Sequence, residues 1–177
     1  QQKMDCVKQM FEVEDNYNIP VINSEYNFDW ENKDLLSTKF TGTWLISALI
    51  NQIKNNYEME LFYSGTSNEP LRAYGMWGNT NIKFPVFNVK KQFTQFHKKG
   101  MTIYKDSISN SDFDVLATNK KYLTVVNKKD KVNLLVLEII NINSQKLKDL
   151  NSNIEYTINN SRITLDFNNY EVKFLEI

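Results

Sequence analysis

One short segment of the sequence collects several residue types that could do chemistry together. Residues 19–30 read IPVINSEYNFDW, in which an apolar run is followed closely by Glu25. The run from Ile19 to Ile22 is too short for a helix and contains Pro20, which strands tolerate at their start. In βα units the loops that follow the strands converge at one edge of the sheet or barrel. Catalytic and ligand-binding residues are therefore concentrated at that edge. The segment therefore predicts a short buried strand that delivers Glu25, with amides and aromatic rings, to a candidate site.

The overall composition disfavours some classes of binding partner. The 177 residues include 21 basic and 21 acidic side chains, so no excess of positive charge is present to neutralise phosphates. We therefore expect no nucleic acid partner. Aromatic residues make up 13% of the chain, and without positive charge they suit an uncharged ligand such as a sugar. No apolar run approaches the ~20 residues of a membrane span, so we expect no membrane partner.

Scarce residue types exclude several kinds of site. Cys6 is the only cysteine, so neither an internal disulfide nor a cysteine zinc site can form within the chain. His97 is the only histidine, and its place at the end of a predicted helix favours a structural role, where a positive charge suits the helix dipole. Asp106, Asp112 and Asp114 lack the spacing of a calcium loop, so we expect turn and solvation roles. We expect no metal and no other cofactor.

The first 99 residues alternate between helical and strand patterns. An amphipathic stretch precedes the first strand. Apolar residues at three-to-four spacing then predict a helix from Phe40 to Ile53 that ends at Asn55-Asn56. Residues 57–63 alternate as a strand does, and a long loop follows from about residue 66 to residue 83. Pro85 then begins another helix, at a position where its missing N–H costs nothing.

From Gly100 onward the sequence carries strand signals only. Short β-prone runs are separated by Asn, Asp, Ser and Lys, as in an antiparallel sandwich. These runs are residues 101–104, 113–118, 122–126, 133–140, 154–158, 162–167 and 170–177. The predicted fold class is therefore α/β plus all-β, with a βαβα segment over residues 1–99 and a β-sandwich module over residues 100–177. Two strands and about three helices cannot bury both faces of a parallel sheet, so the first piece needs the β module, a partner chain or further sequence.

Several short motifs, taken in order, carry a resemblance to a known class of enzyme. They are SEYN (24–27) and FYSG (62–65) at strand ends, YGMWG (74–78) in a loop, KFPVFNV (83–89) opening a helix, and DVLAT (114–118) and LTVVNK (123–128) in the β module. This order resembles the last quarter of a retaining (β/α)8 glycoside hydrolase of clan A, with its C-terminal β-sandwich. The type it is most similar to is family 39, the β-xylosidases and α-iduronidases. The resemblance covers essentially the whole chain.

The resemblance implies a fragment or subunit of a retaining glycoside hydrolase that cleaves O-glycosidic bonds by a two-carboxylate double displacement. Glu25 matches the nucleophile at the end of the seventh barrel strand. The acid/base Glu belongs to strands one to six, which are missing, so it lies outside this chain. Residues that the resemblance makes candidates for substrate binding are Asn27, Trp30, Tyr63, Trp77 and Glu69. The implied partners are a carbohydrate and either a second polypeptide or a missing N-terminal region that completes the barrel.

Other interpretations stay open on the sequence alone. The chain could be a non-catalytic carbohydrate-binding or assembly module derived from such an enzyme, with Glu25 idle. Residues 40–44 superficially match the Gly-x-Trp opening of lipocalins, although the apolar spacing around Trp44 is helical. Residues 1–5 look like the middle of a helix, so we expect a piece of something longer. The compartment is open between cytosol and export, with export favoured because many sugar-cleaving enzymes are secreted.

Overall fold

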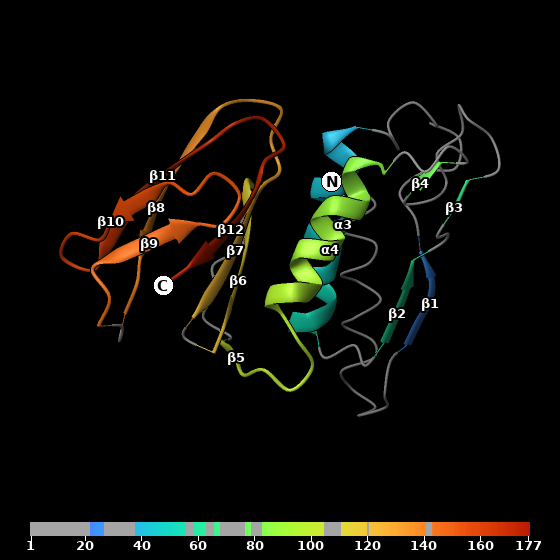
Figure 1. Ribbon diagram of the computed structural model, residues 1–177, viewed down its shortest axis with the longest axis horizontal. Coiled ribbons are helices and arrows are strands. Elements are labelled where there is room, and N and C mark those ends of the chain that lie inside the picture. Colours follow the sequence, from blue (N-terminus) through green and yellow to red (C-terminus); the bar gives the residue numbers. More distant parts are fainter. Residues whose placement is uncertain are drawn as a thin grey trace.

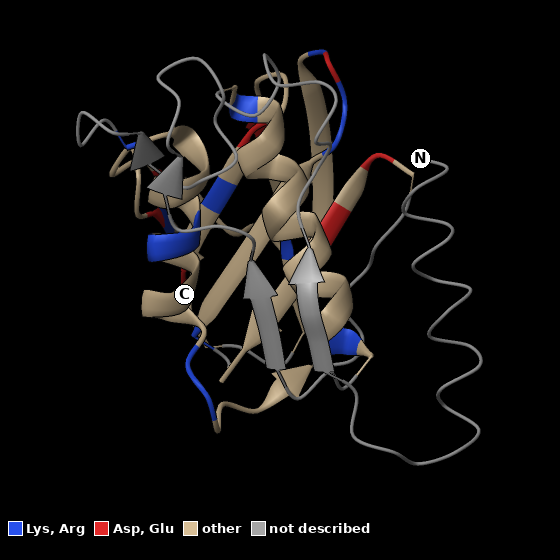
Figure 2. Ribbon diagram, turned by 90° about the vertical axis from the view of Figure 1, so that its right-hand side faces the viewer, with Lys and Arg blue, Asp and Glu red and all other residues tan. Residues whose placement is uncertain are grey.

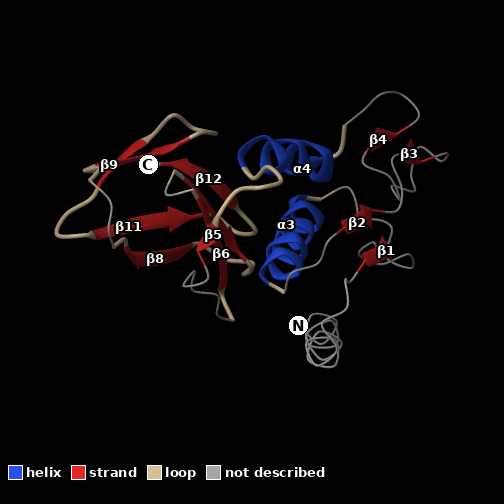
Figure 3. Ribbon diagram, turned by 90° about the horizontal axis from the view of Figure 1, so that it is seen from below, coloured by secondary structure: helices blue, strands red, loops and turns tan. Residues whose placement is uncertain are grey.

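The computed structural model describes residues 22–26, 38–55, 59–62, 66–67, 77–78, 83–104, 111–119, 121–140 and 143–177. Its elements form three layers (Figures 1 and 3). A β-sandwich lies on one side, helices α3 (Lys39–Lys54) and α4 (Pro85–Phe96) lie in the middle, and a pair of strands lies beyond the helices. That pair is β1 (Ile22–Tyr26) and β2 (Met59–Phe62), which are parallel. Among the described helices, none has the length and apolar character of a membrane span.

Both helices begin and end close to where the sequence predicts. The last turn of α3 carries Lys54, a cation that suits the negative end of the helix dipole. The backbone N–H of Asn55 closes that turn by donating to the carbonyl of Asn51 at 3.1 Å. Helix α4 has Pro85 in its first turn, preceded by an extended N-cap at Phe84. The helix predicted before the first strand lies outside the described residues.

The residues after Gly100 form the antiparallel sandwich that the sequence predicts. One sheet has the strand order β10-β9-β12-β7-β6-β5, and β8 pairs with β11 in a second, two-stranded sheet. The strands are β5 (Ile103–Tyr104), β6 (Phe113–Thr118), β7 (Tyr122–Asn127), β8 (Asn133–Glu138), β9 (Lys146–Asp149), β10 (Glu155–Thr157), β11 (Arg162–Phe167) and β12 (Val172–Glu176).

The prediction missed three strands. Strand β9 reads KLKD, and its only large apolar residue is Leu147, so the sequence gives almost no alternation to recognise. The interval predicted as one long loop, residues 66–83, contains β3 (Thr66–Ser67) and β4 (Trp77–Gly78), which pair in parallel. These two-residue strands are too short to leave a periodic signal.

The six-stranded sheet has an apolar core on each of its faces. Val115 and Val125 belong to the core between this sheet and the β8–β11 pair. Leu116 and Phe174 belong to the other core, where the sheet packs against α3 and α4. Successive residues of a strand point to opposite faces, which is why neighbours such as Val115 and Leu116 are buried on different sides. The two helices therefore share a continuous core with the sandwich.

A turn of the sandwich also attaches to the start of α3. The hydroxyl of Thr43 donates to the backbone carbonyl of Tyr170 at 2.6 Å, and the ring of Phe40 meets the Tyr170 ring edge-on at 4.9 Å between centroids. Tyr170 has a φ of 48°, which is an uncommon conformation for a bulky side chain. These contacts with α3 hold the residue in that conformation.

Candidate active site

The candidate site begins at the carboxyl end of β1. Strands β1 and β2 are parallel, so their carboxyl ends lie at the same edge, and Glu25 is the penultimate residue of β1. The register pairs Asn23 with Glu60 and then Tyr26 with Phe62. Strand β1 therefore advances three residues while β2 advances two, and the extra residue falls in the Ser24–Glu25 step. Such bulges are over-represented beside active sites, because they re-aim a side chain.

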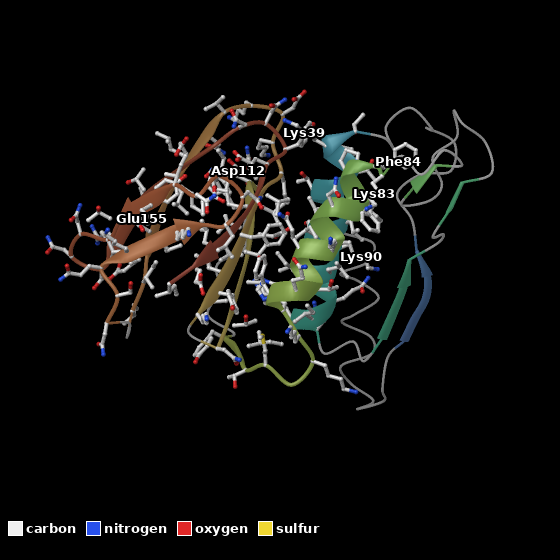
Figure 4. The ribbon with its side chains drawn as sticks, viewed as in Figure 1. Lys39, Lys83, Phe84, Lys90, Asp112 and Glu155 are labelled. Carbon is white, nitrogen blue, oxygen red and sulfur yellow. The ribbon has the colours of Figure 1, made fainter. Side chains whose placement is uncertain are left out.

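Other elements gather at the same edge. Figure 1 shows β3 and β4 beyond the arrowheads of β1 and β2, so Trp77 lies in a strand toward the end where Glu25 is found. Helix α4 begins on this side as well, and Figure 4 labels Lys83 and Phe84 at its start. The Lys83 amine lies 5.1 Å from the centroid of the Phe87 ring, a cation–π contact. This arrangement is typical of βα units, in which the carboxyl end of each strand lies on the same side as the start of the helix that follows it.

The structure therefore positions two of the predicted site residues in strands. Glu25 belongs to β1 and Trp77 belongs to β4. The other four predicted site residues lie outside the described residues: Asn27, Trp30, Tyr63 and Glu69. The catalytic and substrate-binding roles of all six stay predictions.

A buried polar cluster that the sequence did not predict joins α3 to the sandwich. Asp114 is 2% exposed, and its carboxylate accepts hydrogen bonds from the Ser47 hydroxyl and, at 3.0 Å, from the Lys128 amine. Burial lowers the pKa of the nearby Lys54 amine, and the charge of Asp114 opposes that shift. The expectation of a solvated turn role for Asp114 is wrong, because the residue sits on the sheet face that α3 covers.

His97 lies on the same face of the sheet, at the end of α4. Its backbone N–H donates to the carbonyl of Phe93 at 2.8 Å. Its Nδ1 lies 3.0 Å from the hydroxyl oxygen of Thr118, and its Nε2 lies 2.6 Å from that of Thr124. Burial lowers the pKa of His97 to about 4, so the ring is neutral at pH 7. The predicted position at a helix end is confirmed, whereas the predicted positive charge is wrong.

Charge and potential metal ligands are dispersed over the described part of the chain. Figure 2 shows the blue Lys and Arg positions and the red Asp and Glu positions spread over several parts of the ribbon. Within the described ranges, no three His, Cys, Asp or Glu side chains come together as metal ligands would.

Comparison with known proteins shows similarity in fold only. No protein-family model matches the sequence, and no curated protein matches it. A family 30 subfamily 8 xylanase from Clostridium acetobutylicum matches with a TM-score of 0.70 and 16% identity, over 91% of this chain and 43% of that one. A family 39 glycoside hydrolase from Bacteroides cellulosilyticus matches with a TM-score of 0.69 and 11% identity, over 90% and 34%. A rhamnosyl-glucuronidase from Fusarium oxysporum matches with a TM-score of 0.66 and 14% identity, over 90% and 44%.

The fold of this chain is thus that of a part of clan A glycoside hydrolases. The resemblance that the sequence motifs predict is confirmed at the level of fold, including a family 39 member. The chain spans 34 to 44% of the length of these three structures.

Proposed function

We propose that this chain is the C-terminal part of a retaining glycoside hydrolase, in which Glu25 is the nucleophile. The observation that carries the proposal is the position of Glu25. It is the penultimate residue of β1, at a bulge, beside the parallel strand β2, in a fold shared with clan A glycoside hydrolases. Because βα units carry their catalytic groups where strands end, this position suits a carboxylate that meets substrate.

The chemistry requires two carboxyl groups roughly 5–5.5 Å apart, on either side of the scissile bond. The Glu25 carboxylate attacks the anomeric carbon and forms a covalent glycosyl-enzyme. A second carboxyl group protonates the leaving oxygen and later activates the water that releases the sugar. We assign that second group to barrel strands outside this chain. The chain spans less than half the length of the structures it matches, so by itself it is expected to be inactive.

The proposed substrate is a carbohydrate held at the carboxyl edge of β1 and β2. Trp77, Tyr63 and Trp30 would form aromatic walls for the apolar face of a sugar. Asn27 and Glu69 would hydrogen-bond its hydroxyls.

The β-sandwich of residues 100–177 would hold α3 and α4 in place behind the strands. The core that the sandwich shares with these helices supports that role. The remaining strands of the barrel would come from a second polypeptide or from an N-terminal region.

The first test is the mass of the native particle beside the mass of its denatured chains. A second chain, on the order of 200 residues to complete a typical barrel of ~250, supports the proposal. The same holds for a longer gene product with this chain at its end. A folded, monomeric chain with no upstream coding sequence would instead favour a non-catalytic binding or assembly module.

The second test labels the nucleophile in the completed enzyme. An activated fluorosugar forms a slowly hydrolysed glycosyl-enzyme, and peptide mass spectrometry should locate the sugar on Glu25. Glu25→Gln should abolish both labelling and turnover while the fold persists. The matched control is Glu138→Gln on β8, an exposed carboxylate whose contact with Arg162 is long, at 3.8 Å. Label on another carboxylate, or normal turnover by Glu25→Gln, would overturn the assignment.

A further inference from the structure

A second cleft lies on the β-sandwich, in the part that faces away from α3 and α4. Its volume is about 480 Å³, within the range of ~300–1,000 Å³ that small-molecule sites occupy. Three segments line it: Ile139 after β8, residues 143–145 before β9, and residues 157–161, which run from the last residue of β10 to the start of β11. Figures 1 and 3 show these strands on the opposite side of the helices from β1 and β4. The cleft is therefore separate from the candidate active site.

Backbone hydrogen bonds hold the three walls together. The N–H of Ile139 donates to the carbonyl of Ser161 at 2.7 Å, and the N–H of Ile158 donates to the carbonyl of Gln145 at 2.8 Å. Asn159 and Arg162 exchange two bonds of 2.8 Å across a tight turn whose central residues both have positive φ. The backbone twist of such a turn matches the twist of the strands that flank it. Backbone hydrogen bonds between the lining segments therefore fix the shape of the cleft.

The side chains that line the cleft are neutral and rich in hydrogen-bonding groups. None of the described residues that line the cleft is charged. Charges nearby are paired with each other, Lys146 with Glu155 at 2.6 Å and Arg162 with Glu138 at 3.8 Å. Figure 4 labels Glu155 at this end of the sandwich. Four lining amides make no side-chain hydrogen bond to another described residue: Asn143, Gln145, Asn159 and Asn160. Each amide offers both a donor and an acceptor to a ligand.

We propose that this cleft is a binding site for a neutral oligosaccharide. Sugar hydroxyls both donate and accept, so they pair with side-chain amides in the same way that the amides pair with water. The absence of charge from the lining disfavours acidic sugars, because a carboxylate would lose hydration without gaining a cation. Among the described lining residues there is no aromatic ring to stack a nucleobase, and the apolar contribution comes from the partly buried Ile139, because Ile158 belongs to the core. Retention of polymeric substrate at this site rests on the proposed glycosidase function, whereas sugar binding at the cleft does not depend on the role of Glu25.

The test is a nuclear magnetic resonance titration of the ¹⁵N-labelled 177-residue chain with xylohexaose, cellohexaose and tetragalacturonate. The side-chain amide signals of Asn143, Gln145, Asn159 and Asn160 should move saturably with at least one neutral oligosaccharide and not with the acidic one. The double variant Gln145→Ala/Asn159→Ala should weaken that binding at least tenfold. It leaves Asn160 and Ser161 intact because these residues adopt positive φ. The matched control is Gln95→Ala, an exposed amide on α4, which should bind as the parent does.

Two results would overturn the proposal. One is the lack of any saturable shift with the neutral oligosaccharides at tens of millimolar. The other is binding that the double variant retains and that shifts signals of β1 or β4 instead, which would place the sugar at the candidate active site. Unchanged backbone spectra of the double variant show that its fold is intact. A failed Glu25 assignment would leave this titration unaffected, so the two proposals are tested separately.

Discussion

The imidazole Nε2 of His97 lies 2.6 Å from the Thr124 hydroxyl oxygen, which joins the end of helix α4 to the middle of strand β7. The other ring nitrogen reaches Thr118 on β6. A neutral imidazole has one donor and one acceptor, and each hydroxyl can serve as either, so both contacts are satisfied without a charge. One side chain therefore ties the helix layer to two neighbouring strands of the sandwich.

This arrangement predicts a stability that falls in mild acid. The pKa of His97 is about 4 in the folded chain and 6.5 when unperturbed, so between these values only the unfolded chain takes up the proton. The free energy of unfolding should therefore decrease as the pH falls from about 6.5 to about 4, by at most about 3 kcal/mol. This prediction is checked by measuring the free energy of unfolding in urea for the parent and for His97→Gln across this pH range. The variant cannot titrate there, so parallel pH profiles for the two proteins would contradict the prediction.

Removing the Asp114 carboxylate should loosen the contact between α3 and the sandwich. Asp114→Ala removes the acceptor of the buried Ser47 hydroxyl and the carboxylate that pairs with the Lys128 amine at 3.0 Å. We expect a loss of about 2–4 kcal/mol in the free energy of unfolding, the usual cost of breaking a buried charged pair from one side. The matched control is Asp112→Ala, labelled in Figure 4, whose ion pair with Lys129 is exposed. An equal loss in both variants would show that burial of Asp114 does not matter.

The close approach of the two helices should reverse the usual effect of replacing glycine. A Cβ at Gly42 would lie 3.1 Å from Cγ2 of Val89 on α4. Alanine normally favours a helix over glycine by up to ~1 kcal/mol, but this contact should cancel that gain in the parent. In the Val89→Ala background the contact is gone, so Gly42→Ala should become stabilising by a few tenths to ~1 kcal/mol. Thermal unfolding of the parent, the two single variants and the double variant measures the effect of Gly42→Ala in each background. The same effect in both backgrounds would contradict the close contact between Gly42 and Val89.

Trp77 should act on substrate binding in the completed enzyme. If it forms a wall for the sugar, Trp77→Ala should lower kcat/KM by roughly fivefold, on the order of 1 kcal/mol, mainly through a higher KM. Trp44→Phe is the matched control, because Trp44 packs against the core between α3 and the sheet. Steady-state kinetics on an aryl glycoside checks both. Unchanged KM for Trp77→Ala would remove this residue from the substrate site.

The candidate site was partly predictable, because a strand end is a local feature. A short apolar run followed by Glu25 indicated a carboxylate where a strand ends, and β1 does end one residue after Glu25. The register shift between Asn23 and Tyr26 was not predictable, since it exists only relative to the register of β2. Neither was the role of Asp114, because a carboxylate beside turn residues looks the same whether or not a helix covers it.

The sequence by itself determined the elements whose signal is local. Periodic apolar residues and Pro85 defined α3 and α4, and alternation defined most strands of the sandwich. Tertiary structure alone decided which elements meet. Strand β8 pairs with β11 rather than with β7 or β9, its neighbours in sequence. Strand β9 is recognisable as a strand only from its pairing with β10 and β12. In β6 the first four residues are all buried, because one face meets the helices and the other meets the second sheet. Alternation assigns residues to two faces, but what covers each face depends on partners distant in the chain.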